Sequence, residues 1–230
     1  MLARRGSSRY LPAVLLYLHG FASGPSSNKA RHLARRFGEI GISLDVPDLT
    51  PGEEGFERST PSSMRAVAAA RLASAAPPHA VIGSSLGGYL AATIASADPS
   101  VERLVLLAPA FRLFERWAAR LTDAEKEEWR TGGLETLHYA SNRRRRIGWG
   151  FFEDAARWPA FPEVRVPTLC IAGRRDETVP LEDVERFVAR TPSARLVVVD
   201  DGHELAASLD RIFEEARDFL APWEGTALEE

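Results

Sequence analysis

Short, almost continuous apolar runs constrain the fold of this chain more than any other feature of its sequence. Turn residues bound each run, and apolar and polar residues do not alternate within it. This pattern is typical of strands buried on both faces, as in a parallel sheet that helices cover. The runs are AVLLYL (13–18), ISLDV (42–46), AVIG (80–83), RLVLLA (103–108), TLCIAG (168–173) and RLVVVD (195–200).

Segments with a helical spacing of apolar residues lie between these runs. A chain of 230 residues that is 45% hydrophobic is expected to form one domain, covering 1–230, around a sizeable core. The alternation of strands and helices predicts an α/β fold with a mostly parallel sheet and right-handed crossovers. The expected helices cover 26–37, 62–73, 86–97, 181–189 and 205–220.

The region 111–162 interrupts this alternation, because it contains no strand-like run. It is far longer than the plain loops of compact domains, so we expect an inserted helical cap. Residues 112–128 are typical of an amphipathic helix, which Thr131-Gly132-Gly133 would end. The aromatic residues of this region could form the wall of a substrate pocket or the core of the cap. The pocket candidates are Phe111, Trp149 and Phe152.

Charge and cysteine content exclude several classes of protein. The net charge of −3 provides no basic excess for binding nucleic acid. The single basic run, Arg143 to Arg146, would bind an anionic group or form a solvated face. Cys170, the only cysteine, lies in an apolar run and is expected in the core, so no disulfide is predicted.

The N-terminal stretch and the glycine-containing segments were compared with the patterns of signal peptides and of cofactor-binding sites. Arg4 and Arg5 followed by LPAVLLYL resemble a short signal peptide, but the apolar run is near the lower length limit for one and too short to span a membrane, and His19-Gly20 follows where a small-residue cleavage site would be needed. We therefore interpret Val14 to Leu18 as a buried strand and expect a cytoplasmic protein. Gly24 and Lys29 are not adjacent, so GFASGPSSNK does not match a P-loop. Neither GxGxxG nor HExxH occurs. We therefore expect no metal and no organic cofactor.

The stretch GSSLG, Gly83 to Gly87, matches G-x-S-x-G with Ser85 at its centre. It follows an expected strand and opens an alanine-rich helical segment. In a strand-to-helix turn of this kind, glycines allow the close passage of strand and helix, and the serine hydroxyl is held above the sheet as a nucleophile. The alternative is a tight turn of small residues without a chemical role.

A serine hydroxyl is a poor nucleophile without a base. In hydrolases with this turn, an acid and then a histidine follow the serine in the chain. Of the histidines that follow Ser85, His138 lies in the expected cap, whereas His203 comes directly after the last expected strand. That position is at the carboxyl edge of the sheet, where ligands of open α/β sheets bind. We expect His203 to be the general base and acid, and a surface histidine near a helix start is the alternative.

The acid that orients the histidine should follow the penultimate strand. AGRRDETVP places Asp176 and Glu177 there, and the pattern G-x-x-D-x-x-V-P favours Asp176. Its task would be to hold the imidazole in the correct tautomer. An ordinary helix-capping aspartate is the alternative. Asp200 and Asp201 are near neighbours of His203 in the chain and are poorly placed to reach its ring.

Acyl transfer also needs an oxyanion hole of two N–H donors, and the loss of one donor typically costs about 3–4 kcal/mol of barrier. The N–H of Leu86 lies at a helix N-terminus, where donors are free. The second donor should come from the loop LHGFASGP after the first strand, and the H-G-x form indicates the N–H of Phe21. His19 would then orient this loop.

The motifs YLHGF, GSSLGGY, LLAPA, AGRRDETVP and DDGHEL occur in the order and at the intervals of the α/β-hydrolase superfamily. Within it, YLHGFASGPSSNKA and GSSLGGYLAA resemble the small bacterial esterases of the YqiA type. The resemblance implies a sheet without a leading antiparallel hairpin, a Ser85-Asp176-His203 triad, oxyanion donors at Phe21 and Leu86, and carboxylic-ester hydrolysis. The region 111–162 does not match the YqiA pattern.

We therefore expect a serine esterase that acts on a small-molecule ester through an acyl-enzyme, with no membrane or nucleic-acid partner. A thioesterase or a hydrolase of small peptide amides would use the same three residues. A peroxidase variant could share them too. A scaffold protein that has lost the chemistry of the fold is the alternative from another class. The sequence does not give the oligomeric state.

Overall fold

The computed structural model describes residues 13–52, 54–221 and 223, and Arg4 and Arg5 lie outside them. Its centre is a six-stranded sheet in the order β2-β1-β3-β4-β7-β8, in which every described pair of neighbouring strands is parallel. This confirms the expected α/β class. The strands are β1 (Leu15–Leu18), β2 (Leu44–Asp45), β3 (His79–Ser84), β4 (Val101–Leu107), β7 (Thr168–Gly173) and β8 (Ala194–Val199).

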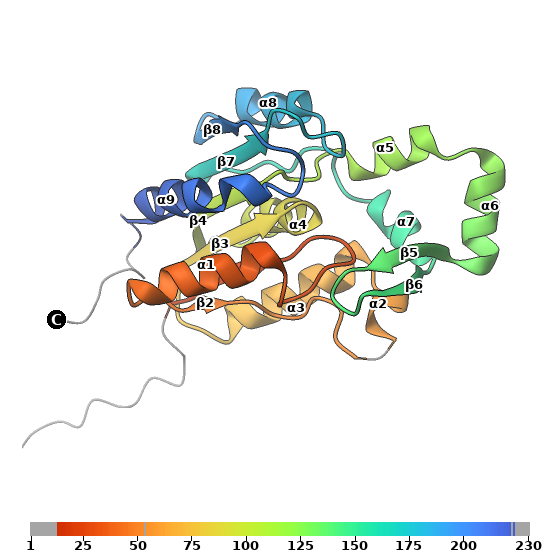
Figure 1. Ribbon diagram of the computed structural model, residues 1–230, viewed down its shortest axis with the longest axis horizontal. Coiled ribbons are helices and arrows are strands. Elements are labelled where there is room, and N and C mark those ends of the chain that lie inside the picture. Colours follow the sequence, from red (N-terminus) through yellow and green to blue (C-terminus); the bar gives the residue numbers. More distant parts are fainter. Residues whose placement is uncertain (1–12, 53, 222, 224–230) are drawn as a thin grey trace, which may run out of the picture.

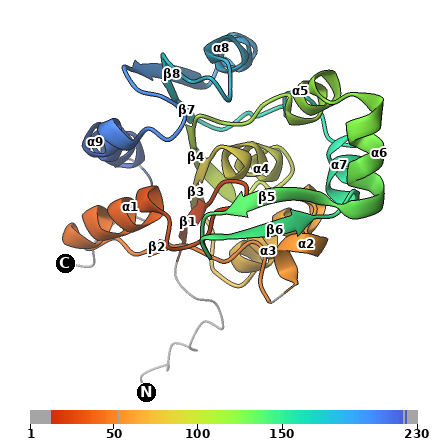
Figure 2. The same ribbon diagram turned by 45° about the vertical axis from the view of Figure 1, so that its right-hand side comes forward.

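Helices cover both faces of the sheet (Figures 1 and 2). The helices α1 (Asn28–Glu39) and α9 (Leu209–Leu220) pack on one face, and α3 (Pro61–Ala73), α4 (Leu86–Ala95) and α8 (Leu181–Arg190) pack on the other. Successive residues of the central strands β1, β3, β4 and β7 enter different cores. In β1, Leu15 and Tyr17 belong to the core under α1 and α9, whereas Leu16 and Leu18 belong to the opposite one. Both faces are buried, which explains the continuous apolar runs.

Most element boundaries shift by one or two residues from the sequence-based expectation, and two elements differ in kind or length. The strand expected at 42–46 is reduced to Leu44–Asp45 at the edge of the sheet. The helix expected from residue 205 begins as a 3₁₀ turn at Ala206–Ser208 and becomes α-helical only at Leu209. Leu205 has a φ of 52°, in the left-handed region, so it cannot be part of a regular helix.

The region 111–162 is an insertion between the neighbouring strands β4 and β7. The single helix expected at 112–128 is divided in two, because Thr122 forms a capping box with Glu125 and so starts a second helix. The insertion also contains an antiparallel hairpin, so it is not the purely helical cap that the sequence predicted. Its elements are α5 (Leu113–Arg120), α6 (Asp123–Gly132), β5 (Leu134–His138), β6 (Arg143–Ile147) and α7 (Gly150–Ala155).

The hairpin was not recognised in the sequence because four of the five residues of β6 are arginines, so the strand shows no alternation of apolar and polar residues. The run Arg143 to Arg146 lies in β6, where Arg143, Arg144 and Arg146 are exposed. Arg144 forms an ion pair with Glu135 of β5, at 3.1 Å. The tip of the hairpin reaches the loop after β1, since the N–H of Tyr139 donates to the carbonyl of Ala22 at 2.7 Å. The insertion thus borders the carboxyl end of β1.

Over the described ranges, no helix combines the length and the hydropathy that a membrane crossing requires.

Candidate active site

Ser85 occupies a strained turn between β3 and α4. Its backbone angles are φ 54° and ψ −118°, which a residue with a side chain rarely adopts. The turn closes only because glycines flank it. A Cβ atom added to Gly87 would lie 2.1 Å from the carbonyl oxygen of Leu18, and one added to Gly83 would lie 2.3 Å from the carbonyl oxygen of Gly87. The close passage that the G-x-S-x-G motif predicts is therefore present.

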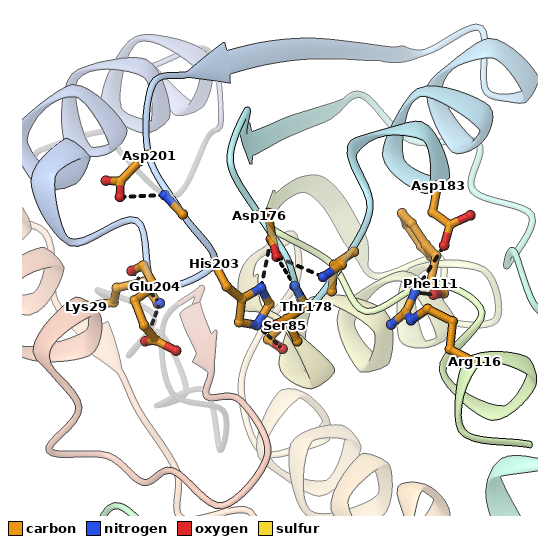
Figure 3. Close-up of polar contacts among 12 residues, drawn as sticks. Lys29, Ser85, Phe111, Arg116, Asp176, Thr178, Asp183, Asp201, His203 and Glu204 are labelled. Atoms are coloured by element: carbon orange, nitrogen blue, oxygen red, sulfur yellow. Dashed lines mark hydrogen bonds and ion pairs between the residues drawn. The ribbon is translucent and has the colours of Figure 1, made fainter. Parts of the chain in front are cut away.

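Three side chains from three loops meet at this turn (Figure 3). The Nε2 atom of His203 lies 2.9 Å from the hydroxyl oxygen of Ser85, and its Nδ1 atom lies 2.8 Å from a carboxylate oxygen of Asp176. These residues follow β8, β3 and β7, so each lies at the carboxyl end of a parallel strand. The structure therefore brings together the three residues that the sequence singled out.

The surroundings of Asp176 favour its ionised form. Burial raises the pKa of this carboxyl, but the hydrogen bond from His203 and those from the N–H groups of Val179 and Thr178 outweigh it, so the pKa is below its usual value. Both N–H donors lie 2.8 Å from Oδ1. The ionised carboxylate accepts a hydrogen bond from the Nδ1–H group of His203, which leaves Nε2 unprotonated and able to accept the proton of the Ser85 hydroxyl.

The other acidic residues near these loops have different contacts. Asp200 pairs with Arg175 at 3.3 Å. The carboxylate of Asp201 accepts from the N–H groups of Gly202 and Ala207, and so stabilises the loop that carries His203. Glu177 is exposed. Asp176 is therefore the acid that contacts the imidazole.

The loop after β1 lies against Ser85. A Cβ atom added to Gly20 would lie 3.4 Å from the Cβ atom of Ser85 and 4.0 Å from its hydroxyl oxygen. Within the described part of the chain, the N–H groups of Phe21 and Leu86 donate no hydrogen bond. Leu86 is the first residue of α4, where an N–H has no acceptor inside the helix. Both groups thus retain a free donor beside the serine.

His19 fixes this loop as a neutral ring. Its Nε2 atom accepts a hydrogen bond from the N–H of Leu49 at 3.1 Å, so its Nδ1 atom carries the proton and lies 3.1 Å from the carbonyl oxygen of Gly20. Burial lowers the pKa of His19, which favours the same neutral state. His138 lies elsewhere, with its Nδ1 atom 2.9 Å from the hydroxyl of Ser141 in the hairpin.

The three aromatic residues predicted to line a pocket are packing residues in this structure. Phe111 is completely buried and stacks on Phe187 with ring centroids 4.3 Å apart, so it offers no surface to a substrate. Trp149 and Phe152 stack on each other at 4.5 Å inside the insertion, and both contact Trp129. The alternative that the sequence left open, a core of the cap, describes Trp149 and Phe152, whereas Phe111 packs against Phe187 of α8, outside the insertion.

One aromatic side chain of the loop after β1 was missed by sequence reasoning, which considered only its N–H. The ring of Phe21 lies 5.4 Å from that of Phe151 and 5.6 Å from those of Trp117 and Phe56. It thus joins the loop after β1 to the aromatic core of the insertion. The signal was an aromatic residue directly after His19-Gly20, in a loop where a small residue would suffice for the turn.

The residues covered by the structure contain no group of three or more histidine, cysteine, aspartate or glutamate side chains that could hold a metal ion.

Comparisons with known proteins agree with the fold. The family described as "Uncharacterised protein family (UPF0227)" matches residues 14–221. Among curated proteins, the pimeloyl-acyl-carrier-protein methyl ester esterase of Xanthomonas oryzae pv. oryzae is 29% identical, over 91% of this chain and 95% of the relative. The protein of the same description from Xanthomonas campestris pv. campestris is 27% identical, over 83% and 87% of the two chains.

Solved structures show the same architecture at lower sequence identity. The alpha/beta hydrolase domain-containing protein 10 from mouse superposes with a TM-score of 0.77 and 20% identity, over 95% of this chain and 97% of that one. Est1E from Butyrivibrio proteoclasticus superposes with a TM-score of 0.67 and 19% identity, over 94% and 89%. The α/β-hydrolase fold predicted from the sequence motifs is therefore confirmed.

Proposed function

Since the chain belongs to the uncharacterised protein family UPF0227, in agreement with its YqiA-type motifs, and has the α/β-hydrolase fold, we propose that it is a serine esterase. It hydrolyses carboxylic esters through an acyl-enzyme intermediate on Ser85. The observation that carries this proposal is the continuous hydrogen-bonded series from Asp176 through His203 to Ser85. The Xanthomonas relatives, which are described as methyl ester esterases, support the choice of an ester.

In the first half of the reaction, the hydroxyl oxygen of Ser85 attacks the ester carbonyl carbon while Nε2 of His203 takes its proton. Asp176 holds the ring in the required tautomer and offsets the positive charge that develops on it. The tetrahedral oxyanion accepts hydrogen bonds from the N–H groups of Phe21 and Leu86. His203 then donates its proton to the leaving alcohol, and the acyl group remains on Ser85.

In the second half, a water molecule takes the place of the alcohol. His203 accepts a proton from this water as its oxygen attacks the acyl carbon, and the same two N–H groups stabilise the second oxyanion. The proton then passes from His203 to Ser85 as the acid leaves. The protein residues supply every proton transfer in this scheme, so it needs no cofactor.

A thioester or a peptide amide could undergo the same steps, because the nucleophile and base do not distinguish the leaving group. The description of the relatives favours an ester with a small alcohol, and we propose methyl esters of acyl chains as the first substrates to examine. Matched ester, thioester and amide substrates with one common acyl group separate these possibilities. An amide or a thioester hydrolysed faster than the ester would contradict the esterase proposal.

The proposal is tested with Ser85→Ala on a short p-nitrophenyl ester and with a fluorophosphonate probe. Ser85→Ala is expected to lower kcat by about 10⁴-fold or more and to abolish labelling, because no other group takes the place of the nucleophile. Ser84→Ala is the matched control within the same motif, and it should still be labelled. A native protein that the probe does not label would instead favour a scaffold without hydrolytic chemistry.

A further inference from the structure

Lys29 makes a contact that the proposed chemistry does not yet explain. It lies in α1, at the end of the stretch GFASGPSSNK, which does not match a P-loop. Its side chain is only 10% exposed. The Nζ atom donates to the backbone carbonyl of Glu204 at 2.7 Å and lies 3.2 Å from the carboxylate of the same residue. Figure 3 shows this contact beside His203.

The contact joins two loops of the candidate site. Glu204 directly follows His203, so its carbonyl belongs to the backbone that carries the imidazole. At the other end, α1 begins after Ser27, at the end of the loop that contains Phe21. Lys29 therefore connects the loop of the base to the helix that follows the loop of the oxyanion donor.

The loop of the base depends on such support, because its backbone is not in a regular conformation. Leu205 has a φ of 52°, and its N–H donates to the carbonyl of Gly202 at 3.2 Å, so the chain turns tightly around His203. The carboxylate of Asp201 stabilises the side of this turn that faces α9, through Ala207 and Ser208. At Glu204, the described contact to the loop backbone comes from the side chain of Lys29.

The backbone carbonyl, and not the carboxylate, is the important partner. The side chain of Glu204 is 81% exposed, and an ion pair with so exposed a partner contributes little. A largely buried ammonium group, in contrast, loses most of its hydration and needs a nearby acceptor. The carbonyl oxygen of Glu204, 2.7 Å away, is such an acceptor. The hydrogen bond therefore fixes both the side chain of Lys29 and the backbone at Glu204.

We propose that Lys29 is a positioning residue, which holds the loop of His203 so that the imidazole stays within hydrogen-bonding distance of Ser85. The proposal rests on the serine esterase function stated above. Lys29 does not contact the substrate and takes no part in proton transfer. A displacement of the base by about 1 Å can cost about a hundredfold in rate, so removal of the ammonium group should act on kcat.

The test compares Lys29→Met, Lys29→Arg and Arg36→Met in the full chain. Lys29→Met should lower kcat by about tenfold to a hundredfold, with a much smaller change in KM, and should slow fluorophosphonate labelling by the same factor. Lys29→Arg keeps a donor for the carbonyl and should recover most of the loss. Arg36 lies on the same helix and pairs with Asp210 of α9, so Arg36→Met removes another link from α1 to the C-terminal part without touching the loop of His203.

A second measurement follows the imidazole directly. The proton on Nδ1 of His203, shared with Asp176, should give a downfield proton resonance in the wild type and in Arg36→Met. This resonance should be shifted or broadened in Lys29→Met. If Lys29→Met lowers the melting temperature too far, Lys29→Gln takes its place. Its neutral amide is too short to reach the carbonyl of Glu204, so it should show the same loss of kcat and the same change in the resonance, whereas Lys29→Arg should not.

Two results would overturn the proposal. One is a Lys29→Met protein with wild-type kcat and an unchanged His203 resonance. The other is an Arg36→Met protein that loses as much kcat as Lys29→Met at the same melting temperature. A wild-type chain without Ser85-dependent hydrolysis would contradict the esterase function instead, and the resonance comparison would then still decide whether Lys29 holds the loop.

Discussion

The Nε2 atom of His203 lies 2.9 Å from the hydroxyl oxygen of Ser85, although 118 positions separate the two residues in the chain. The parallel sheet accounts for this proximity. Ser85 follows β3 and His203 follows β8, and the carboxyl ends of parallel strands lie at one edge. The contact therefore depends on the arrangement of the whole sheet as well as on the local turn that holds Ser85.

Asp176→Asn is expected to lower kcat by about 10³-fold to 10⁴-fold, with the fold retained. An amide in this place can donate to Nδ1 of His203, which would put the ring proton on Nε2 and remove the acceptor that Ser85 needs. Initial rates on a short ester provide the measurement. Glu177→Gln, an exposed neighbour, is the matched control and should keep wild-type rates. Equal rates for the two variants would argue against a role for Asp176.

The stability of the protein should fall in acid partly because of Asp176. Its folded-state pKa is lowered, so the ionised form contributes stability that is fully present above the unfolded-state pKa of about 3.9 and is lost as the pH falls through the folded-state value. Urea unfolding of the wild type and Asp176→Asn from neutral to strongly acidic pH measures this. The difference in unfolding free energy between the two proteins should shrink below about pH 4. A constant difference over the whole range would contradict the prediction.

Gly87→Ala should destabilise the protein by about 3 kcal/mol or more, because its Cβ atom would lie 2.1 Å from the carbonyl oxygen of Leu18 and the backbone would have to move. Gly38→Ala is the control, since a Cβ atom there meets nothing within 4 Å and the residue lies in α1. It should stabilise by about 0.5 kcal/mol. Thermal and urea unfolding of both variants provide the comparison, and similar stabilities would show that the turn has room to relax.

Cys170 should be unreactive in the native protein. It is completely buried in β7, and burial raises the pKa of its thiol to about 12, so almost no thiolate is present at neutral pH. Ellman's reagent should therefore react with the folded protein at a negligible rate and with one thiol per chain in urea. Rapid reaction under native conditions would mean that this part of the sheet opens readily.

The sequence predicted the sheet, and the approach of Asp176 and His203 to Ser85, for a common physical reason. Strands buried on both faces leave a strong apolar signal, and the elbow of Ser85 requires glycines at fixed positions. Together, the apolar strand signal and the glycines of the elbow indicate which loops lie at the carboxyl edge of the sheet. The choice between Asp176 and Glu177 was less direct, and the hydrogen bonds from Thr178 and Val179 give it a structural reason.

The structure of the insertion was less predictable, because its strands and buried side chains leave only a weak pattern of apolar residues in the sequence. The strand β6 consists largely of arginines, so its sequence lacks the alternation of apolar and polar residues by which a half-buried strand is recognised. The role of Phe111 could not be read from its type, since a buried ring and a pocket wall have the same composition. Lys29 also had no signal, because its acceptor is a backbone carbonyl 175 positions away.

The insertion leaves the sheet after β4 and returns at β7, and these two strands pair directly with each other. The distance between these two strands is therefore set by their pairing, and it does not fix the length or shape of the segment that connects them. Evolution could lengthen, shorten or exchange this segment while Ser85, Asp176 and His203 stay on elements outside it. Closely related chains could thus diverge in the compounds they accept while the same chemical apparatus is inherited unchanged.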